Sequence, residues 1–231
     1  MSNKIPSHIV LFPDGNRRWA RKKGLPALIG HQQGYKNLTE FSKWCKNRGV
    51  KVLTAFGFST ENWKRSKREV GYLMKLFEKG LSSEKNIKAF NKNEVRLKII
   101  GQKEPLPKSL QKTIIKIENL TKNNKKFKLN LAVSYGGRWD IIQAVQKIIK
   151  EKIPIKDITE DLMEKYLSTA GLPAPDLIIR AGGEKRLSNF VIWQGAYSEL
   201  YFSKKLWPDF TEKDLDKALD EYARRQRRFG E

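Results

Sequence analysis

Residues 8–20 read HIVLFPDGNRRWA, and this stretch is the starting point for the fold. The apolar run at 8–12 is short and continuous, which is typical of a strand buried on both faces of a sheet. It leads directly into a turn formed by Asp14, Gly15 and Asn16, where a helical pattern begins. A buried strand followed at once by a helix predicts a sheet with helices packed on its faces.

The same alternation of apolar runs and amphipathic stretches continues along the chain. Further strands are expected at 52–59, 96–101, 128–135, 176–181 and 199–202. Helices are expected at 32–48, 69–91, 107–124, 138–151, 159–168 and 211–228. Because the strands are apolar throughout and helices separate them, we predict an α/β fold with a central, mostly parallel six-stranded sheet flanked by helices.

The length and composition fit one folded unit. With 231 residues, of which 39% are hydrophobic, the chain can bury a core without disulfides, and we predict a single domain over residues 1–231. Its one cysteine, Cys45, cannot form an internal disulfide. No apolar stretch reaches the roughly 18 to 20 residues that cross a bilayer, and the first residues lack the apolar core of a signal peptide, so a cytoplasmic location is expected.

The charge of the chain is strongly positive. Its 47 lysines and arginines against 25 aspartates and glutamates give a net charge of +22. Such a charge attracts nucleic acid, anionic membranes and phosphorylated metabolites alike. Most of the excess is lysine scattered over expected helix surfaces, which is typical of a solvated face. Nucleic-acid binding would rest on charge alone, because no base-reading module is visible, and we do not predict it.

The turn after the first strand combines a carboxylate with groups that bind anions. Helix N-terminal amides and Arg18 can hold a diphosphate, while Asp14 can bind a Mg2+ ion that bridges the same oxygens. Taken alone, the Asp-Gly-Asn sequence fits equally well a polar turn that caps a helix.

The loop after the second expected strand adds more polar groups. The sequence GFSTENWKRSKREV at 57–70 brings together Ser59, Asn62, Arg65 and Glu69. On its own, this segment is better explained as a capped turn that feeds a helix.

The loop after the expected strand at 176–181 offers a second anion site. Two arginines and a hydroxyl suit the oxygens of a second diphosphate, namely Arg180, Arg186 and Ser188. Glycines in this loop let the backbone approach an anion closely, although a glycine pair is also an ordinary turn. The chain ends in EYARRQRRFGE at 221–231, whose arginines on their own fit a basic tail or a nucleic-acid patch.

These segments resemble, in order, successive signature blocks of the cis-prenyltransferases, the family that includes undecaprenyl diphosphate synthase and dehydrodolichyl diphosphate synthase. The blocks are HIVLFPDGNRRWA, the Gly-His pair at 30–31, FSTENWKR, SYGGRWDI and RAGGEKRLSNFVIWQGAYSELYF. Together they span nearly the whole chain. The aspartate-rich DDxxD motif of the trans-type synthases is absent.

The resemblance implies a transferase that condenses isopentenyl diphosphate with an allylic prenyl diphosphate. The product is a cis polyprenyl diphosphate, a precursor of glycan carrier lipids. The resemblance also implies Mg2+ as cofactor, a hydrophobic tunnel enclosed by the fold, and a homodimeric or heterodimeric assembly. A long prenyl product is insoluble in water and the chain is basic, so a peripheral membrane contact is expected as well.

The resemblance assigns the first diphosphate site. Asp14 looks like the catalytic, Mg2+-binding aspartate that assists departure of the allylic diphosphate, and Glu199 resembles a metal-supporting carboxylate within or across the dimer. Residues similar to those around the first diphosphate are Gly15, Asn16, Arg18, His31 and Arg65. The catalytic loop residues near the reacting centre are matched by Ser59 and Asn62, and an acidic residue of the closing loop by Glu69.

The second site is assigned in the same way. Residues that look like the isopentenyl diphosphate clamp are Arg180, Arg186 and Ser188. The terminal segment Arg228-Phe229-Gly230 is similar to the Arg-x-Gly ending by which a partner subunit completes that site.

Some positions depart from the family pattern. Ala27 stands where many members carry an arginine for the first diphosphate, a loss for which Arg21, Lys22 or Lys23 could compensate, and Ala181 replaces a common hydroxyl residue. The alanine at position 27 leaves open a short-chain cis-prenyl synthase or transfer to another acceptor, and the Arg-Phe-Gly ending leaves open a non-catalytic partner subunit. The intact Asp14 and Arg18 argue against the last of these.

Overall fold

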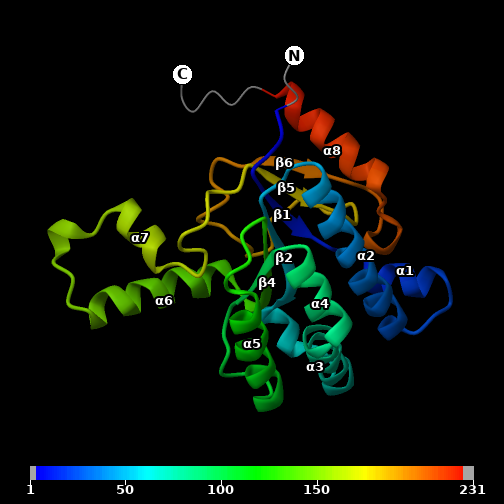
Figure 1. The fold of residues 1–231 in the computed structure, drawn as a ribbon, viewed down its shortest axis with the longest axis horizontal. Coiled ribbons are helices and arrows are strands. Elements are labelled where there is room, and N and C mark those ends of the chain that lie inside the picture. The colour runs from blue at the N-terminus through cyan, green and yellow to red at the C-terminus, as the bar shows by residue number, and fades with distance from the viewer. Residues whose placement is uncertain (1–3, 226–231) are drawn as a thin grey trace.

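The computed structural model describes residues 4–225, which form one six-stranded sheet with helices packed against it (Figure 1). The strands are β1 His8–Phe12, β2 Val52–Ser59, β3 Val95–Ile100, β4 Phe127–Tyr135, β5 Leu177–Arg180 and β6 Glu199–Phe202. They lie in the order β3-β4-β2-β1-β5-β6, and every neighbouring pair is parallel. The predicted α/β fold is confirmed, and each strand ends within one residue of its predicted bounds.

Parallel pairing collects the ends of four strands at one edge of the sheet. Phe12 at the end of β1 pairs with Arg180 at the end of β5, and Ser59 of β2 pairs with Tyr135 of β4. The loops that follow these strands therefore lie along the same edge. Ligands of open parallel sheets bind at this carboxyl edge, and most of the predicted site residues are found there.

The α-helices in the described part of the chain are α1 Asn16–Lys22, α2 Ala27–Asn47, α3 Lys67–Ser82, α4 Glu84–Lys92, α5 Lys108–Thr121, α6 Gly137–Lys150, α7 Glu160–Tyr166 and α8 Glu212–Arg224. Short 3-10 helices are η1 Thr60–Lys64, η2 Ile155–Asp157 and η3 Trp207–Asp209. Helix α2 begins at Ala27, whereas the predicted start was residue 32. Glycine weakens an isolated helix, but here glycine lets α2 pack closely against α1. A Cβ atom at Gly30 would lie only 2.1 Å from the main-chain oxygen of Asn16 in α1.

The prediction of one continuous helix at 69–91 is wrong. Ser83 lies between α3 and α4 with φ −62° and ψ 119°, outside the helical region. Its hydroxyl accepts a hydrogen bond from the main-chain N–H of Asn86 at 3.4 Å. A serine that caps a new helix competes with continuation of the old one. The helix predicted at 211–228 is observed over Glu212–Arg224, and it ends there because Arg225 is extended, with φ −81° and ψ 139°. Residues 226–228 lie outside the described part of the chain.

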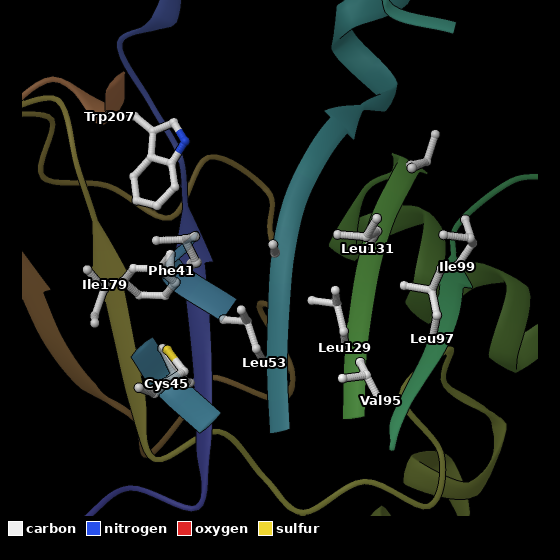
Figure 2. Close-up of a cluster of buried hydrophobic side chains, with 14 of the residues drawn as sticks. Phe41, Cys45, Leu53, Val95, Leu97, Ile99, Leu129, Leu131, Ile179 and Trp207 are labelled. Carbon is white, nitrogen blue, oxygen red and sulfur yellow. The ribbon is translucent and has the colours of Figure 1, made fainter. Parts of the chain in front are cut away.

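The main core lies on the sheet face covered by α2, α3, α5 and α8. Strand side chains that point to this face include Leu53, Leu97, Ile99, Leu131 and Ile179 (Figure 2). Phe41 of α2 and Trp207 are fully buried against them, with ring centroids 5.4 Å apart. Cys45 is completely buried in the same core, and burial raises the pKa of its thiol far above the usual range.

The opposite face has a smaller core built around Phe190, which stacks on Phe56 with ring centroids 4.0 Å apart. Helices α6 and α7 extend away from the body of the molecule (Figure 1) and share a separate apolar cluster. Among residues 4–225, no helix is both long and apolar enough to cross a bilayer.

Candidate active site

A cavity of about 990 Å³ opens at the carboxyl edge of the sheet. Part of its wall is polar and comes from the loops that follow β1, β2 and β5. Another part is apolar and is lined by Leu38, Leu73, Leu76 and Phe77. The volume and the mixed wall suit a ligand with a charged head and a hydrocarbon tail.

Ten predicted site residues line this cavity. They are Asp14, Gly15, Asn16, Arg18, His31, Ser59, Asn62, Arg65, Arg180 and Ser188. Because they come from α1, α2, β2, η1, β5 and the loops after β1, η1 and β5, parallel pairing is what brings them together.

Asp14 lies at the polar end of the cavity, in the turn between β1 and α1. The turn requires glycine at position 15, where φ is +106° and a Cβ atom would lie 2.8 Å from the side chain of Leu206. Oδ2 of Asp14 accepts a hydrogen bond from Arg180 Nη2 at 2.9 Å, and Oδ1 lies 3.3 Å from Arg18 Nη2. The Asp14 side chain is 34% exposed, so its carboxylate is accessible to a ligand.

Arg180 is a buried cation with 4% of its surface exposed. Its Nη1 donates to Ser188 Oγ at 2.8 Å and to the main-chain oxygen of Arg186. Its guanidinium lies 5.0 Å from the ring centroid of Phe12, and its Nε has no partner among the described residues. Such a fixed guanidinium favours an anion in one position and orientation.

Arg186, the other predicted clamp arginine, does not line the cavity. Its side chain is 61% exposed, and Nη1 donates to Glu184 Oε2 at 2.6 Å. The other oxygen of Glu184 accepts from Arg18 Nη1 at 3.2 Å. Glu184 therefore bridges the two predicted diphosphate sites, and the sequence analysis missed it although it lies inside the quoted RAGGEKR segment.

Glu69 joins a histidine and two arginines beside the cavity. Its Oε1 accepts hydrogen bonds from His31 Nε2 and Arg65 Nη1, both at 3.0 Å, and its Oε2 lies 3.8 Å from Arg17 Nε. Burial lowers the pKa of His31, against the opposing effect of Glu69, so the imidazole is neutral at pH 7. Burial raises the pKa of Glu69, but the hydrogen bond from His31 and the charges of Arg65 and Arg17 lower it overall. Two guanidiniums against one carboxylate leave net positive charge at this wall.

Ser59 and Asn62 form a reciprocal capping box at the start of η1. The main-chain N–H of Ser59 donates to Asn62 Oδ1 at 3.2 Å, and the Ser59 side chain accepts from the main chain of Asn62. The segment is thus a capped turn, and both residues also line the cavity.

Asn16 is held close to α2. Its Nδ2 donates to the oxygen of Pro13 at 3.3 Å, and its buried Oδ1 has no hydrogen-bond partner among the described residues. A Cβ atom at Gly34 would lie 2.2 Å from Oδ1, so glycine at this position makes room for the amide.

The wall contains further polar residues that the sequence analysis did not assign, namely Arg17, Glu61, Arg138 and Asn189. Each lies within or next to a quoted signature block, which is the signal that could have drawn attention to them. Ala27 and Arg21 both line the cavity, so Arg21 is placed where it could compensate for the missing arginine.

Glu199, like Glu69 and Arg186, does not line the cavity. Glu199 pairs with Leu177 at the start of β5, the edge opposite Asp14, and accepts a hydrogen bond from Arg225 Nη1 at 2.8 Å. Arg228 and Gly230 lie outside the described residues. Within residues 4–225 there is no group of three or more His, Cys, Asp or Glu side chains that could hold a metal ion.

Comparison with known sequences identifies similar proteins over the full length. A family model described as putative undecaprenyl diphosphate synthase matches residues 12–230. An isoprenyl transferase of Thermotoga maritima is 48% identical over 229 residues, covering 98% of this chain and 97% of that protein. A (2E,6E)-farnesyl-diphosphate specific ditrans,polycis-undecaprenyl-diphosphate synthase of Legionella pneumophila is 44% identical, with coverage of 100% and 98%.

Two solved structures are also similar. The lavandulyl diphosphate synthase of Lavandula x intermedia, in complex with dimethylallyl diphosphate, has a TM-score of 0.93 and 40% identity, covering 98% of this chain and 99% of that one. A probable undecaprenyl diphosphate synthase from Campylobacter jejuni has a TM-score of 0.82 and 34% identity, with coverage of 99% and 100%.

Proposed function

This chain belongs to the undecaprenyl diphosphate synthase family and is a cis-prenyltransferase, and we propose that it elongates an allylic prenyl diphosphate with isopentenyl diphosphate. The product is a cis polyprenyl diphosphate, a precursor of a glycan carrier lipid. The observation that carries this proposal is the cavity, where Asp14, Arg18 and Arg180 stand beside an apolar wall.

The first diphosphate belongs beside Asp14, within reach of Arg18 and Arg65, with Asn16 and His31 completing the wall. Negative charge grows on this group as its bond to the allylic carbon breaks, and fixed guanidiniums stabilise that charge. Glu69 acts indirectly, because it holds His31 and Arg65 in place.

The second diphosphate, that of isopentenyl diphosphate, belongs beside Arg180 and Ser188. Arg186 can join this site only by exchanging its contact with Glu184 for the diphosphate, because it does not line the cavity. We assign the predicted role of Arg228 and Gly230 to the same site of a partner subunit.

The reaction exchanges one carbon–oxygen bond for one carbon–carbon bond. The allylic carbon–oxygen bond breaks and the electron pair leaves with the diphosphate. The double bond of isopentenyl diphosphate then attacks the allylic cation, and loss of a proton forms the new cis double bond. Ser59 and Asn62, at the cavity wall where β2 ends, are placed to orient the reacting carbons.

Asp14 is the residue that would hold Mg2+. Its carboxylate is accessible in the cavity, and Mg2+ is typically bound by one or two carboxylates together with substrate phosphates, so the donor set fits this ion. When bound, Mg2+ supplies positive charge to the leaving diphosphate. Participation of Glu199 stays a prediction that requires a second subunit, because one chain keeps it away from Asp14.

The proposal is tested by incorporation of labelled isopentenyl diphosphate with Mg2+. Dimethylallyl, geranyl, farnesyl and geranylgeranyl diphosphates serve as separate primers, and products are resolved by length. Repeated elongation of one primer is the expected result. No incorporation with any primer by folded protein would overturn the proposal and favour the partner-subunit alternative.

A short-chain reaction is the second candidate. It is favoured by Ala27 and by the similarity to lavandulyl diphosphate synthase, a protein crystallised with dimethylallyl diphosphate. The same assay separates the two, because a short-chain enzyme stops after one condensation. Product formation from dimethylallyl diphosphate alone would indicate another acceptor.

We propose a homodimer formed through the projecting helix α6. Ile142, Val145 and Ile149 are 56%, 39% and 70% exposed, and their spacing places them on one face of α6. Ile149→Glu should give a monomer in analytical ultracentrifugation, whereas Ile115→Glu, at a 56% exposed position on α5, should not. A dimer that survives Ile149→Glu would place the interface elsewhere.

Membrane contact is proposed for the rim of the cavity near α1. The basic residues 21–23 lie beside Leu25 and Ile29, each 40% exposed, and Leu25 also lines the cavity. Basic side chains next to exposed apolar ones favour anionic lipid surfaces. Cosedimentation with anionic liposomes at low salt tests this contact, and Leu25→Glu should weaken it. A cytoplasmic location remains part of this proposal.

A further inference from the structure

Asn189 joins three loops at the side of the cavity where Arg180 and Ser188 lie, the proposed site of isopentenyl diphosphate, which is the acceptor. Its Nδ2 donates to Glu61 Oε1 in η1 at 2.9 Å, and its Oδ1 accepts from the main-chain N–H of Arg138 in α6 at 2.9 Å. Its main-chain oxygen accepts from the N–H of Gly137 at 2.6 Å. Asn189, in the loop after β5, is therefore hydrogen-bonded to the segments that follow β2 and β4.

The backbone at this point is unusual. Ser188, Asn189 and Val191 have φ values of +44°, +61° and +41°. Asparagine tolerates this left-handed region better than most residues, but such a conformation persists only where surrounding contacts hold it. The bonds from Asn189 are contacts of this kind, and they fix the chain directly beside Ser188.

The neighbouring loop is packed closely around the Asn189 side chain. A Cβ atom at Gly136 would lie 2.8 Å from Asn189 Nδ2 and 2.7 Å from Thr60 Oγ1. This close approach leaves little space for the amide to turn. The Asn189 amide is therefore held in the one orientation in which it donates to Glu61 and accepts from Arg138.

Asn189 affects the proposed site through its neighbour Ser188. Its Oγ accepts the hydrogen bond from Arg180 Nη1 at 2.8 Å, and both residues line the cavity. A shift of the loop at Asn189 would move this hydroxyl and remove one of the hydrogen bonds that orient the buried guanidinium. Ser188 and Arg180 are the clamp that the proposed function assigns to isopentenyl diphosphate.

We propose that Asn189 is a positioning residue for the acceptor diphosphate, which holds the Ser188–Arg180 clamp in place by joining η1, the start of α6 and the loop after β5. This inference rests on the proposed function. It requires Asn189 to donate to one loop and accept from another at the same time, which an amide can do and a carboxylate cannot.

Asn189→Asp is the sharpest test, because the new side chain has the same shape and can still accept from the N–H of Arg138. It can no longer donate to Glu61, and it places a second carboxylate 2.9 Å from the first. Burial raises the pKa of Glu61, but hydrogen bonds from Asn189, Ser59 and Thr60 lower it overall, so Glu61 is ionised and the two charges repel. We expect the KM and the Kd for isopentenyl diphosphate to rise about tenfold or more, with a much smaller change for the primer.

The second variant exchanges the hydrogen-bond donor and acceptor between positions 189 and 61. In Asn189→Asp/Glu61→Gln, the amide at position 61 can donate to the carboxylate at position 189. The KM and Kd for isopentenyl diphosphate should return to within about threefold of the wild type. A general loss of stability would show neither the selectivity for this substrate nor the recovery. Asn93→Asp, at an exposed position after α4, is the matched control.

The outcomes are separable. An unchanged KM and Kd in Asn189→Asp, or a double variant no better than the single one, overturns the inference while the proposed function stands. Wild-type protein that neither binds nor incorporates isopentenyl diphosphate overturns both. If Asn189→Asp does not fold, Asn189→Gly keeps the left-handed backbone and removes both side-chain bonds, and it must then show the same selective loss.

Discussion

The two proposed diphosphate sites are built in contrasting ways. At the first, the side chains of Asp14 and Arg18 are 34% and 38% exposed and can turn toward a ligand. At the second, the Arg180 side chain is 5% exposed and is fixed by Ser188 and the main chain of Arg186. A leaving diphosphate must be released after every condensation, whereas the acceptor must be held at a set distance from the reacting carbon. This difference indicates that the first site favours release and replacement of its diphosphate, whereas the second site holds its diphosphate in one position.

The largest expected effect comes from removing the group that both sites share. Asp14→Ala deletes the carboxylate that contacts Arg18 and Arg180, together with the proposed Mg2+ contact. We expect the turnover of isopentenyl diphosphate to fall about 10²- to 10³-fold at saturating substrates. Asp220→Ala, at an exposed position on α8, is the control. Turnover of Asp14→Ala close to that of the wild type would refute the assignment of the active site.

The contrast in burial predicts different results for the two arginines. Arg180→Ala removes a buried cation, so it should raise the KM for isopentenyl diphosphate by about 10- to 100-fold and lower the free energy of unfolding by about 1–3 kcal/mol. Arg18→Ala should raise the KM for the primer and change stability by less than about 0.5 kcal/mol. Steady-state kinetics and urea denaturation of both variants measure the difference. Equal losses of stability would remove the distinction between the sites.

The first site also contains a titratable group that the second lacks. Burial keeps the folded-state pKa of His31 below its unfolded value, so the unfolded chain takes up a proton first as the pH falls. Stability should therefore be full above about pH 6.5 and should decrease below it, by at most about 1.4 kcal/mol per pH unit for one histidine. His31→Gln keeps a donor for Glu69 and should remove this share of the slope in urea titrations at pH 7.5 and 5.5. His8, whose pKa burial also lowers, accounts for a separate share.

The smallest effect on rate is expected at the apolar wall. A Cβ atom at Gly57 would lie 3.2 Å from the ring of Phe77 and from the main-chain oxygen of Ala132, so Gly57→Leu should narrow the cavity beside its apolar wall. We expect shorter products, with the first condensation within about threefold of the wild type. Gly71→Leu adds the same side chain where no atom lies within 4 Å of the new Cβ, and its products should keep their length. Identical product lengths for the two variants would exclude a role of this wall in chain growth.

Local patterns in the sequence were sufficient for the strands and for most helices. The apolar run at 8–12 and the turn at Asp14 were predicted because adjacent residues determine both. The break at Ser83 was missed because one side-chain cap decides it. The early start of α2 was missed because Gly30 is explained only by its contact with Asn16.

The residues of the site were predicted from the sequence only where the resemblance to the cis-prenyltransferases assigned them a role. Asp14 and Arg180 are 166 positions apart, and no local pattern indicates that they share a hydrogen bond. Glu184 and Asn189 were missed because their roles consist of contacts between loops. The exposure of Arg186 and the distance of Glu199 from the cavity likewise depend on how the finished sheet places them.

The burial of Cys45 has a practical consequence. As the chain's one cysteine, with no exposed surface and a thiol that resists ionisation, it should not react with maleimides while the protein is folded. A second cysteine introduced on a surface loop would then accept a fluorophore or spin label selectively, with the native residue left in place. Pairs of such labels across the cavity would report its opening and closing during turnover.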